Sequence, residues 1–347
     1  MRSERKHAAH YRTHRIKLGT GVSSLPYHHP LVFADRFIQL HNMTQGRAML
    51  GVGPGALVSD AKMMGIETSE QRDMMEESLE DILKLFDGET VTNKTGWYEL
   101  KDARLQMKPY ANEPIEVVTA SMVSPSGPTA AGKFGTGLMS LSATAAPALN
   151  TAGTNWDIAC EVAAEYGHKM HRNRWRMIGL VHVAETNEQA IQDVEFGLDE
   201  WTQYFEDVAV VPMVPKDRRN DPLAHLIESG MAAVGTPDKV IEQIETLWTA
   251  SQGGFGSFLI TDHNWTPFDA KLKSYEMIAR YVFPHFQNLN SQRPEQVPGF
   301  DNLFANQTPG LISSNLTCPN ASLKTFPPSF SVSEMKYYFL SKLVCLC

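Results

Sequence analysis

The sequence alternates short apolar runs, rich in β-forming residues, with segments whose apolar residues recur at helical spacing. The β-rich runs lie at residues 15–22, 48–52, 115–120, 137–143, 175–184 and 256–261. Helices are predicted at 30–43, 69–88, 155–167, 187–205, 236–250 and 268–286. Nearly continuous apolar strands joined by helices are typical of an α/β protein with a parallel sheet covered by helices. Both an open doubly wound sheet and a closed (β/α)8 barrel have this order, and six strands are two fewer than the barrel requires.

The segment 236–250 illustrates how the pattern predicts a helix. Thr236 is a residue type that caps helix N-termini, and Pro237 suits the first turn, where a backbone N–H has no partner within the helix. Five apolar residues then recur on one face, which we expect to be buried: Val240, Ile241, Ile244, Leu247 and Trp248.

The overall charge excludes several classes of partner. The chain has 31 Lys and Arg residues against 39 Asp and Glu residues, a net charge of −8, and shows no basic face. This balance argues against binding to nucleic acid or to an anionic membrane. No run of 18 apolar residues is present, so no membrane span is predicted. The four cysteines form no disulfide framework, and the reducing cytoplasm is the expected location.

The stretch "LGVGPGALVSD", residues 50–60, places three glycines directly after an apolar run. Its spacing is G-x-G-x-G rather than the G-x-G-x-x-G of dinucleotide-binding proteins, and Pro54 occupies the loop that would face a pyrophosphate. Two interpretations remain, a tight turn between strand and helix or a turn whose small residues leave room for a flat cofactor. The Met-rich segment that follows, residues 60–66, suits the wall of an apolar pocket.

Two further stretches have polar or titratable side chains at the ends of predicted strands. Hydroxyl side chains at 121, 124 and 126 lead into a predicted helix at Pro128, where they would either hold a single phosphate or simply cap the helix. Tyr27, His28 and His29 crowd the turn that follows the first strand, and we predict that they line a substrate pocket. A metal site is not expected, because the histidine pair has no third ligand at a recognisable spacing.

Taken in order, these stretches resemble the bacterial luciferase-like flavin-dependent monooxygenases. The similarity covers roughly residues 11–287 and includes "LGTGVSSLPYHHP", "MTQGRAMLGVGPG", "VVTASMVSPSGPTAAGKFG", "GTPDKVIEQIETL" and "YVFPHF". The words "ASMVSPSGP" are similar to the limonene- and alkanal-monooxygenase type. The resemblance implies a TIM barrel that binds reduced FMN from a separate flavin reductase and uses O2 to oxygenate a small apolar molecule, such as a terpene or an aldehyde. It also implies a homodimer through the barrel helices.

The resemblance further implies which residues hold the flavin. Gly21 and Val22 correspond to a strand end that lies against the flavin ring, with a non-prolyl cis peptide bond between them. Gly53 and Pro54 correspond to positions beside the flavin where relatives often have a phosphate-binding Arg, which Pro54 cannot replace. The phosphate is therefore expected on the loop after residue 120. The predicted cofactor-binding residues are Gly21, Val22, Gly53, Ala120, Ser121, Met122 and Ser124, and no catalytic residue is assigned.

The chain departs from the family at both ends. Members begin with two further βα units, whereas residues 15–22 correspond to the third strand, so we expect an N-terminally truncated barrel domain over 1–287. Residues 288–347 lack periodicity and are expected to form a disordered or loosely docked tail. A barrel without two strands exposes its sheet edges, and we therefore expect this chain to be poorly stable and weakly active or inactive.

Two alternative functions stay open at this point. A deazaflavin (F420)-dependent oxidoreductase on the same barrel would transfer a hydride instead of using O2. A non-catalytic flavin-binding relative would hold the cofactor without turnover. The spectrum of the bound cofactor separates the first alternative from an FMN enzyme, and product formation separates the second.

Overall fold

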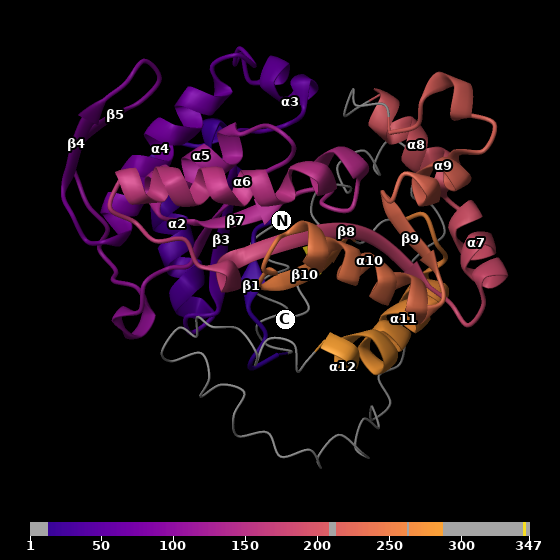
Figure 1. The fold of residues 1–347 in the computed structure, drawn as a ribbon. Helices are drawn as coiled ribbons and strands as arrows, with labels where there is room; N and C mark the ends of the chain where they lie inside the picture. The colour runs from indigo at the N-terminus through magenta and orange to yellow at the C-terminus, as the bar shows by residue number, and fades with distance from the viewer. Residues whose placement is uncertain (1–12, 208–212, 262–263, 287–342, 345–347) are drawn as a thin grey trace, which may run out of the picture.

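A curled, mainly parallel sheet with helices packed around it forms the fold (Figure 1). The structure is a computed structural model that describes residues 13–207, 213–261, 264–286 and 343–344. The strands of the main sheet are β1 (Leu18–Gly19), β2 (Ser23–Ser24), β3 (Ala48–Gly53), β6 (Val117–Ser121), β7 (Gly137–Ser140), β8 (Trp175–Val183), β9 (Ala232–Gly235), β10 (Ser257–Thr261) and β11 (Leu343–Val344). Their order is β1-β3-β6-β7-β8-β10-β11, with β2 also beside β3 and β9 also beside β8.

Of the first strand predicted at 15–22, the structure forms only β1, and a second short strand, β2, follows directly after the predicted range. β1 pairs in parallel with the start of β3, Leu18 opposite Ala48, and β2 pairs with its end, Ser24 opposite Gly53. The chain bends between the two short strands, where the peptide bond from Gly21 to Val22 is cis. The non-prolyl cis bond expected at this position is therefore present.

The sequence patterns did not predict β9. Its four residues read "AAVG", which are too few and too small to carry a β-strand signal. The strand is held by pairing with the second half of β8, Leu180 opposite Ala232. β10 pairs with the first half of the same strand, from Ser257 opposite Arg176 to Thr261 opposite Leu180, so Leu180 is paired with both β9 and β10.

The helices confirm most of the predicted segments. They are α2 (Pro30–Met43), α3 (Val58–Met63), α4 (Gln71–Phe86), α5 (Ser126–Phe134), α6 (Ala146–Glu165), α7 (Asn187–Glu195), α8 (Leu198–Asp207), α9 (Pro222–Glu228), α10 (Pro237–Ala250), α11 (Phe268–Met277) and α12 (Phe283–Phe286). Thr236 precedes α10 as predicted, although its side chain makes no capping hydrogen bond. The single helix predicted over 187–205 is wrong, because the chain turns at Gly197, whose N–H donates to the Trp265 carbonyl at 3.0 Å.

A two-stranded hairpin outside the main sheet was also not predicted. It consists of β4 (Val91–Lys94) and β5 (Glu99–Ala103) and lies at the outer side of α4 (Figure 1). Two hydrogen bonds fasten it to the buried Asp81 of α4. The Tyr98 hydroxyl donates to Asp81 Oδ2 at 2.7 Å, and Asn93 Nδ2 donates to the same oxygen at 2.9 Å.

Apolar side chains fill both faces of the sheet. Val118, Met139, Ile178 and Leu259 form the cluster inside the curl, one each from β6, β7, β8 and β10. Larger clusters pack the helices onto the outer face. A side-chain core inside curled parallel strands is the TIM-barrel arrangement, and the predicted α/β fold class is confirmed. Within the described part of the chain, no helix is both long and apolar enough to cross a membrane.

The predicted domain division at residue 287 and the truncation stay predictions. Most of the predicted tail, residues 288–342 and 345–347, lies outside the described residues. The backbone of β11 pairs antiparallel with β10 at the edge of the sheet, Val344 opposite Ile260.

Candidate functional site

The carboxyl ends of the parallel strands meet at one edge of the curled sheet, and three predicted cofactor residues converge there. A Cβ atom placed on Gly53 would lie 2.9 Å from Cγ2 of Val22 and 3.6 Å from the Cβ of Ala120. These residues come from the bend before β2, from the end of β3 and from β6. Gly53 is buried, whereas Val22 and Ala120 are partly exposed. The edge therefore presents a small apolar surface.

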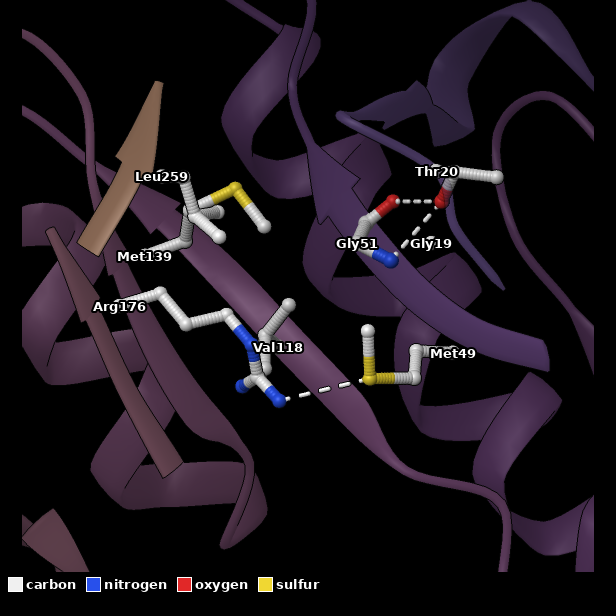
Figure 2. A pocket seen from close by; sticks show the side chains of 8 residues that line it. All are labelled: Gly19, Thr20, Met49, Gly51, Val118, Met139, Arg176 and Leu259. Carbon is white, nitrogen blue, oxygen red and sulfur yellow. Dashed lines mark hydrogen bonds between the residues drawn. The ribbon is translucent and has the colours of Figure 1, made fainter. Parts of the chain in front are cut away.

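Gly51 and Gly55 are each required by a close contact with an earlier segment of the same chain. A Cβ on Gly51 would lie 2.2 Å from the carbonyl oxygen of Thr20, and one on Gly55 would lie 2.6 Å from the Tyr27 hydroxyl. The Thr20 hydroxyl also bonds both the N–H and the carbonyl of Gly51, each at 2.8 Å (Figure 2). The neighbouring segment of the same chain takes up the space that the missing side chains leave.

The loop from β6 to α5 is fixed at its start. The N–H of Leu141 donates to the carbonyl of Ser121 at 2.8 Å. Asn155 of α6, itself buried, donates from Nδ2 to the carbonyl of Met122 at 3.3 Å. The predicted phosphate loop is thus held by a neighbouring strand end and by a helix that follows later in the chain.

The outer part of this loop is open to solvent. Met122 and Val123 are 47% and 41% exposed, which is high for apolar side chains. The hydroxyl oxygens of Ser124 and Ser126 lie 2.9 Å apart at the first turn of α5. Backbone N–H groups in a first helical turn have no partner within the helix, so hydroxyl and amide donors gather at this point.

Tyr27 lies at the same edge, beside the turn that follows β3. Gln71 of α4 donates from Nε2 to the Tyr27 hydroxyl at 3.0 Å and to the Pro54 carbonyl at 3.1 Å. Burial raises the pKa of the Tyr27 phenol, the hydrogen bond from Gln71 lowers it, and the carboxylate of Asp60 raises it. Gln71 was not predicted as a site residue, because the sequence does not indicate which distant residues a polar side chain on a helix will contact.

The two histidines predicted beside Tyr27 lie elsewhere. The ring of His28 stacks on Phe33 of α2, with centroids 5.4 Å apart, and His29 meets the ring of Tyr98 at 6.1 Å. Both histidines are exposed, on the side of the β4–β5 hairpin. The structure does not bring them together with Gly53, and their place in a substrate pocket stays a prediction. No metal-binding group of three His, Cys, Asp or Glu side chains is found among the residues described.

α3 adds apolar side chains near the glycine turn. It begins at Val58, five positions after the last residue of β3. Val58, Met63 and Met64 are 51%, 69% and 51% exposed.

The amino-terminal end of the sheet carries a buried charge cluster instead. Arg176 of β8 bonds Glu116 within hydrogen-bond distance, and Lys17 Nζ lies 2.8 Å from the other Glu116 oxygen. Burial would raise the pKa of Glu116, but the two cations outweigh it and hold the pKa at about 2. This network was not predicted, because its residues lie in three separate strand segments.

A small cavity lies inside the curl between the two ends. Figure 2 shows its lining residues, Gly19, Thr20, Met49, Gly51, Val118, Met139, Arg176 and Leu259. Its free volume is about 10 Å³, roughly what one water molecule needs. It is therefore too small for a flavin.

The sequence profile of the luciferase-like monooxygenase family matches residues 8–252. The chain belongs to this family. A limonene 1,2-monooxygenase of Rhodococcus erythropolis is 44% identical over 80% of the chain and 71% of that protein. A 4-hydroxyprotoasukamycin monooxygenase of Streptomyces nodosus subsp. asukaensis is 38% identical over 79% of the chain and 75% of that protein. As a luciferase-like monooxygenase, the protein is an oxygen-incorporating enzyme.

Solved structures of two cofactor types share this luciferase-like fold. The oxygenating constituent of 3,6-diketocamphane monooxygenase from Pseudomonas putida, in complex with FMN, has a TM-score of 0.64 and 24% identity, covering 81% of this chain and 83% of that one. An F420-dependent secondary alcohol dehydrogenase has a TM-score of 0.62 and 22% identity, covering 80% and 82%. At such identity the likeness describes the fold alone.

Proposed function

We propose that this luciferase-like monooxygenase uses reduced FMN and O2 to oxygenate a small apolar organic substrate of the terpene or aldehyde type. The observation that carries the proposal is the convergence of Val22, Gly53 and Ala120 at the carboxyl edge. Small side chains from neighbouring strands leave a shallow apolar floor, which suits a planar ring system. FMN, when bound, supplies the reduced ring that activates O2.

The loop from β6 to α5 suits the single phosphate of FMN. The Ser124 and Ser126 hydroxyls and the first-turn N–H groups of α5 are hydrogen-bond donors, and anions are favoured at a helix N-terminus. Ser121 and Met122 would hold the backbone of this loop in place through their bonded carbonyls. This is the role proposed for the cofactor residues predicted on this loop.

The exposed apolar side chains supply the second requirement of the proposed reaction. Oxygen transfer needs a site from which water is excluded, since water and protons would divert the activated oxygen. Met63 of α3, Met64 directly after it, and Met122 and Val123 of the loop after β6 are exposed apolar side chains that a bound apolar substrate would cover. A separate flavin reductase would supply the reduced FMN, as the family resemblance implies.

The proposal is tested first by cofactor binding. Oxidised FMN is titrated into the purified chain, and quenching of flavin fluorescence is recorded. Riboflavin, which lacks the phosphate, is the comparison ligand. We expect saturable quenching by FMN at lower concentration than by riboflavin. An absence of quenching for both flavins would overturn the proposal.

Turnover is tested separately. FMN is reduced chemically, mixed with the protein and a panel of terpenes and medium-chain aldehydes under 18O2, and the products are analysed by mass spectrometry. One 18O atom in a protein-dependent product is the expected result. Flavin binding without any labelled product across the panel would favour a non-catalytic flavin-binding role.

An F420-dependent oxidoreductase is the second candidate, and it is favoured by the F420-dependent dehydrogenase that shares the fold. Such an enzyme transfers a hydride and incorporates no oxygen. F420 absorbs at a different wavelength from FMN, so competition between the two cofactors for the same protein sample separates the candidates. Displacement of FMN by equimolar F420 would support this alternative.

A further inference from the structure

The hydroxyl of Tyr27 is held at the carboxyl edge with its oxygen occupied and its proton available. Gln71 donates to the Tyr27 oxygen at 3.0 Å, so this contact uses the acceptor side of the hydroxyl. A tyrosine hydroxyl that accepts a hydrogen bond still has one proton to donate. Among the described residues, no hydrogen bond takes that proton. The hydroxyl is therefore a donor whose acceptor must be solvent or a ligand.

The neighbouring residues fix the position of this donor. Gln71 is 5% exposed and bonds the Pro54 carbonyl as well, which ties the hydroxyl to the turn after β3. Gly55 has a φ of 96°, in the left-handed region, and a Cβ there would lie 2.6 Å from the Tyr27 oxygen. Leu25 and Pro26, which precede Tyr27 in its short helical turn, are buried. The donor is preorganised rather than free to turn away.

The chemistry of the phenol supports a donor role. Burial raises the pKa of Tyr27 and the Asp60 carboxylate raises it further, while the Gln71 bond only partly lowers it. The phenol therefore keeps its proton at neutral pH. An uncharged donor suits a neutral acceptor such as a carbonyl oxygen. It gives no attraction for a plain hydrocarbon.

We propose that Tyr27 selects, among small apolar substrates, those that carry a hydrogen-bond acceptor, such as a terpenoid ketone or an aldehyde, over hydrocarbons of the same skeleton. The inference rests on the proposed function and adds a substrate class to it. A hydrocarbon that covers Tyr27 removes water from a donor and returns no hydrogen bond, which weakens its binding. A carbonyl compound replaces that water with a bond to the same proton.

Carvone and limonene test this inference, because they share a carbon skeleton and differ by one carbonyl group. Each is titrated into the FMN-loaded protein, and the change in the flavin absorption spectrum gives its dissociation constant. The measured quantity is the ratio of the two constants in the wild type divided by the same ratio in Tyr27→Phe. This comparison cancels the different water solubility of the ligands. We expect Tyr27→Phe to reduce the preference for carvone about tenfold.

A matched control separates a local effect from a general one. Tyr281→Phe removes a hydroxyl from a residue that is 57% exposed on the far segment before α12, and it should leave the ratio unchanged. Thermal melting and FMN quenching show whether each variant is folded and loaded. An equal ratio in wild type and Tyr27→Phe, or no binding of either terpene, overturns the inference while FMN quenching persists. Loss of FMN binding in the wild type overturns the proposed function itself.

Discussion

The carboxylate of Glu116 depends on two cations for its charge. Burial alone would raise its pKa above the ordinary 4.5, but Arg176 and Lys17 hold the pKa at about 2. A carboxylate whose pKa falls on folding stabilises the folded state above its ordinary pKa, and this contribution is lost as the pH falls through 4.5 toward about 2. We expect the loss to be on the order of 3 kcal/mol between about pH 6 and about pH 2.

Urea unfolding across that pH range measures this contribution. Glu116→Gln should be less stable than the wild type at about pH 6, since it leaves Arg176 with a neutral partner, and the difference should shrink as the pH falls. Glu113→Gln, an exposed neighbour in sequence, is the control and should follow the wild-type profile. Parallel profiles for Glu116→Gln and the wild type would contradict the assignment.

Gly51 is one of the glycines whose replacement the fold tolerates least. Its Cβ would lie 2.2 Å from a backbone oxygen of Thr20, and backbone cannot move aside as a flexible side chain can. Gly51→Ala should therefore lower the free energy of unfolding by about 3 kcal/mol. Gly96→Ala is the matched control, because nothing lies within 4 Å of a Cβ there. Urea unfolding of both variants measures this difference. Equal free energies of unfolding for Gly51→Ala and Gly96→Ala would contradict the close approach of the Thr20 backbone to Gly51.

Among the elements, α6 acts on the carboxyl edge through one side chain. Asn155 donates to the Met122 carbonyl and so holds the loop proposed to bind the FMN phosphate. Asn155→Ala should weaken FMN binding about tenfold, because one hydrogen bond is worth roughly 1 kcal/mol and the freed loop loses further order. Riboflavin, without a phosphate, should bind the variant as it binds the wild type.

Asn150→Ala provides the control on the same helix, since residue 150 is exposed. Fluorescence quenching by FMN and riboflavin is measured for both variants. An equal loss for the two flavins would mean that Asn155 supports the whole edge. An unchanged affinity of Asn155→Ala for FMN would contradict the proposal that the loop from β6 to α5 binds the phosphate.

The elements predicted from sequence are those whose own residues decide their structure. The segment 236–250 begins with Thr-Pro and keeps one apolar face, and it forms α10 over Pro237–Ala250. The first half of α6 reads "APALNTAGT", which has no apolar stripe, so its helix is set by packing against α5 and the sheet. The β4–β5 hairpin was missed although Val91, Tyr98, Leu100 and Ala103 are its buried residues and Gly96 lies at its turn. Alternation over so few residues is a weak signal.

At the scale of the whole molecule, the positions of the strand ends could be predicted from the sequence, whereas contacts between segments far apart in the sequence could not. The motifs at residues 21–22, 53 and 120–124 were placed correctly at the carboxyl edge, because parallel strands bring their ends together. Gln71 and Asn155 reach that edge from helices, and their contacts depend on how each helix packs. The contacts that require Gly51 and Gly55 could not be predicted for the same reason, because the residues that approach them, Thr20 and Tyr27, lie about thirty positions earlier in the chain.

Cofactor binding at this edge should stabilise the molecule as a whole, since the proposed floor joins the bend before β2 to β3 and β6 in one sheet. A ligand that binds only the folded state at about 100 times its dissociation constant adds about 2.7 kcal/mol, which for a chain of this size raises the melting temperature by roughly 4 °C. FMN should produce this shift, and riboflavin at the same concentration a smaller one. F420 serves as the competitor in the same melting assay. A larger shift with F420 than with FMN would indicate that the carboxyl edge binds F420 and that the enzyme transfers a hydride. No shift with any of the three would mean that the floor formed by Val22, Gly53 and Ala120 holds none of these cofactors.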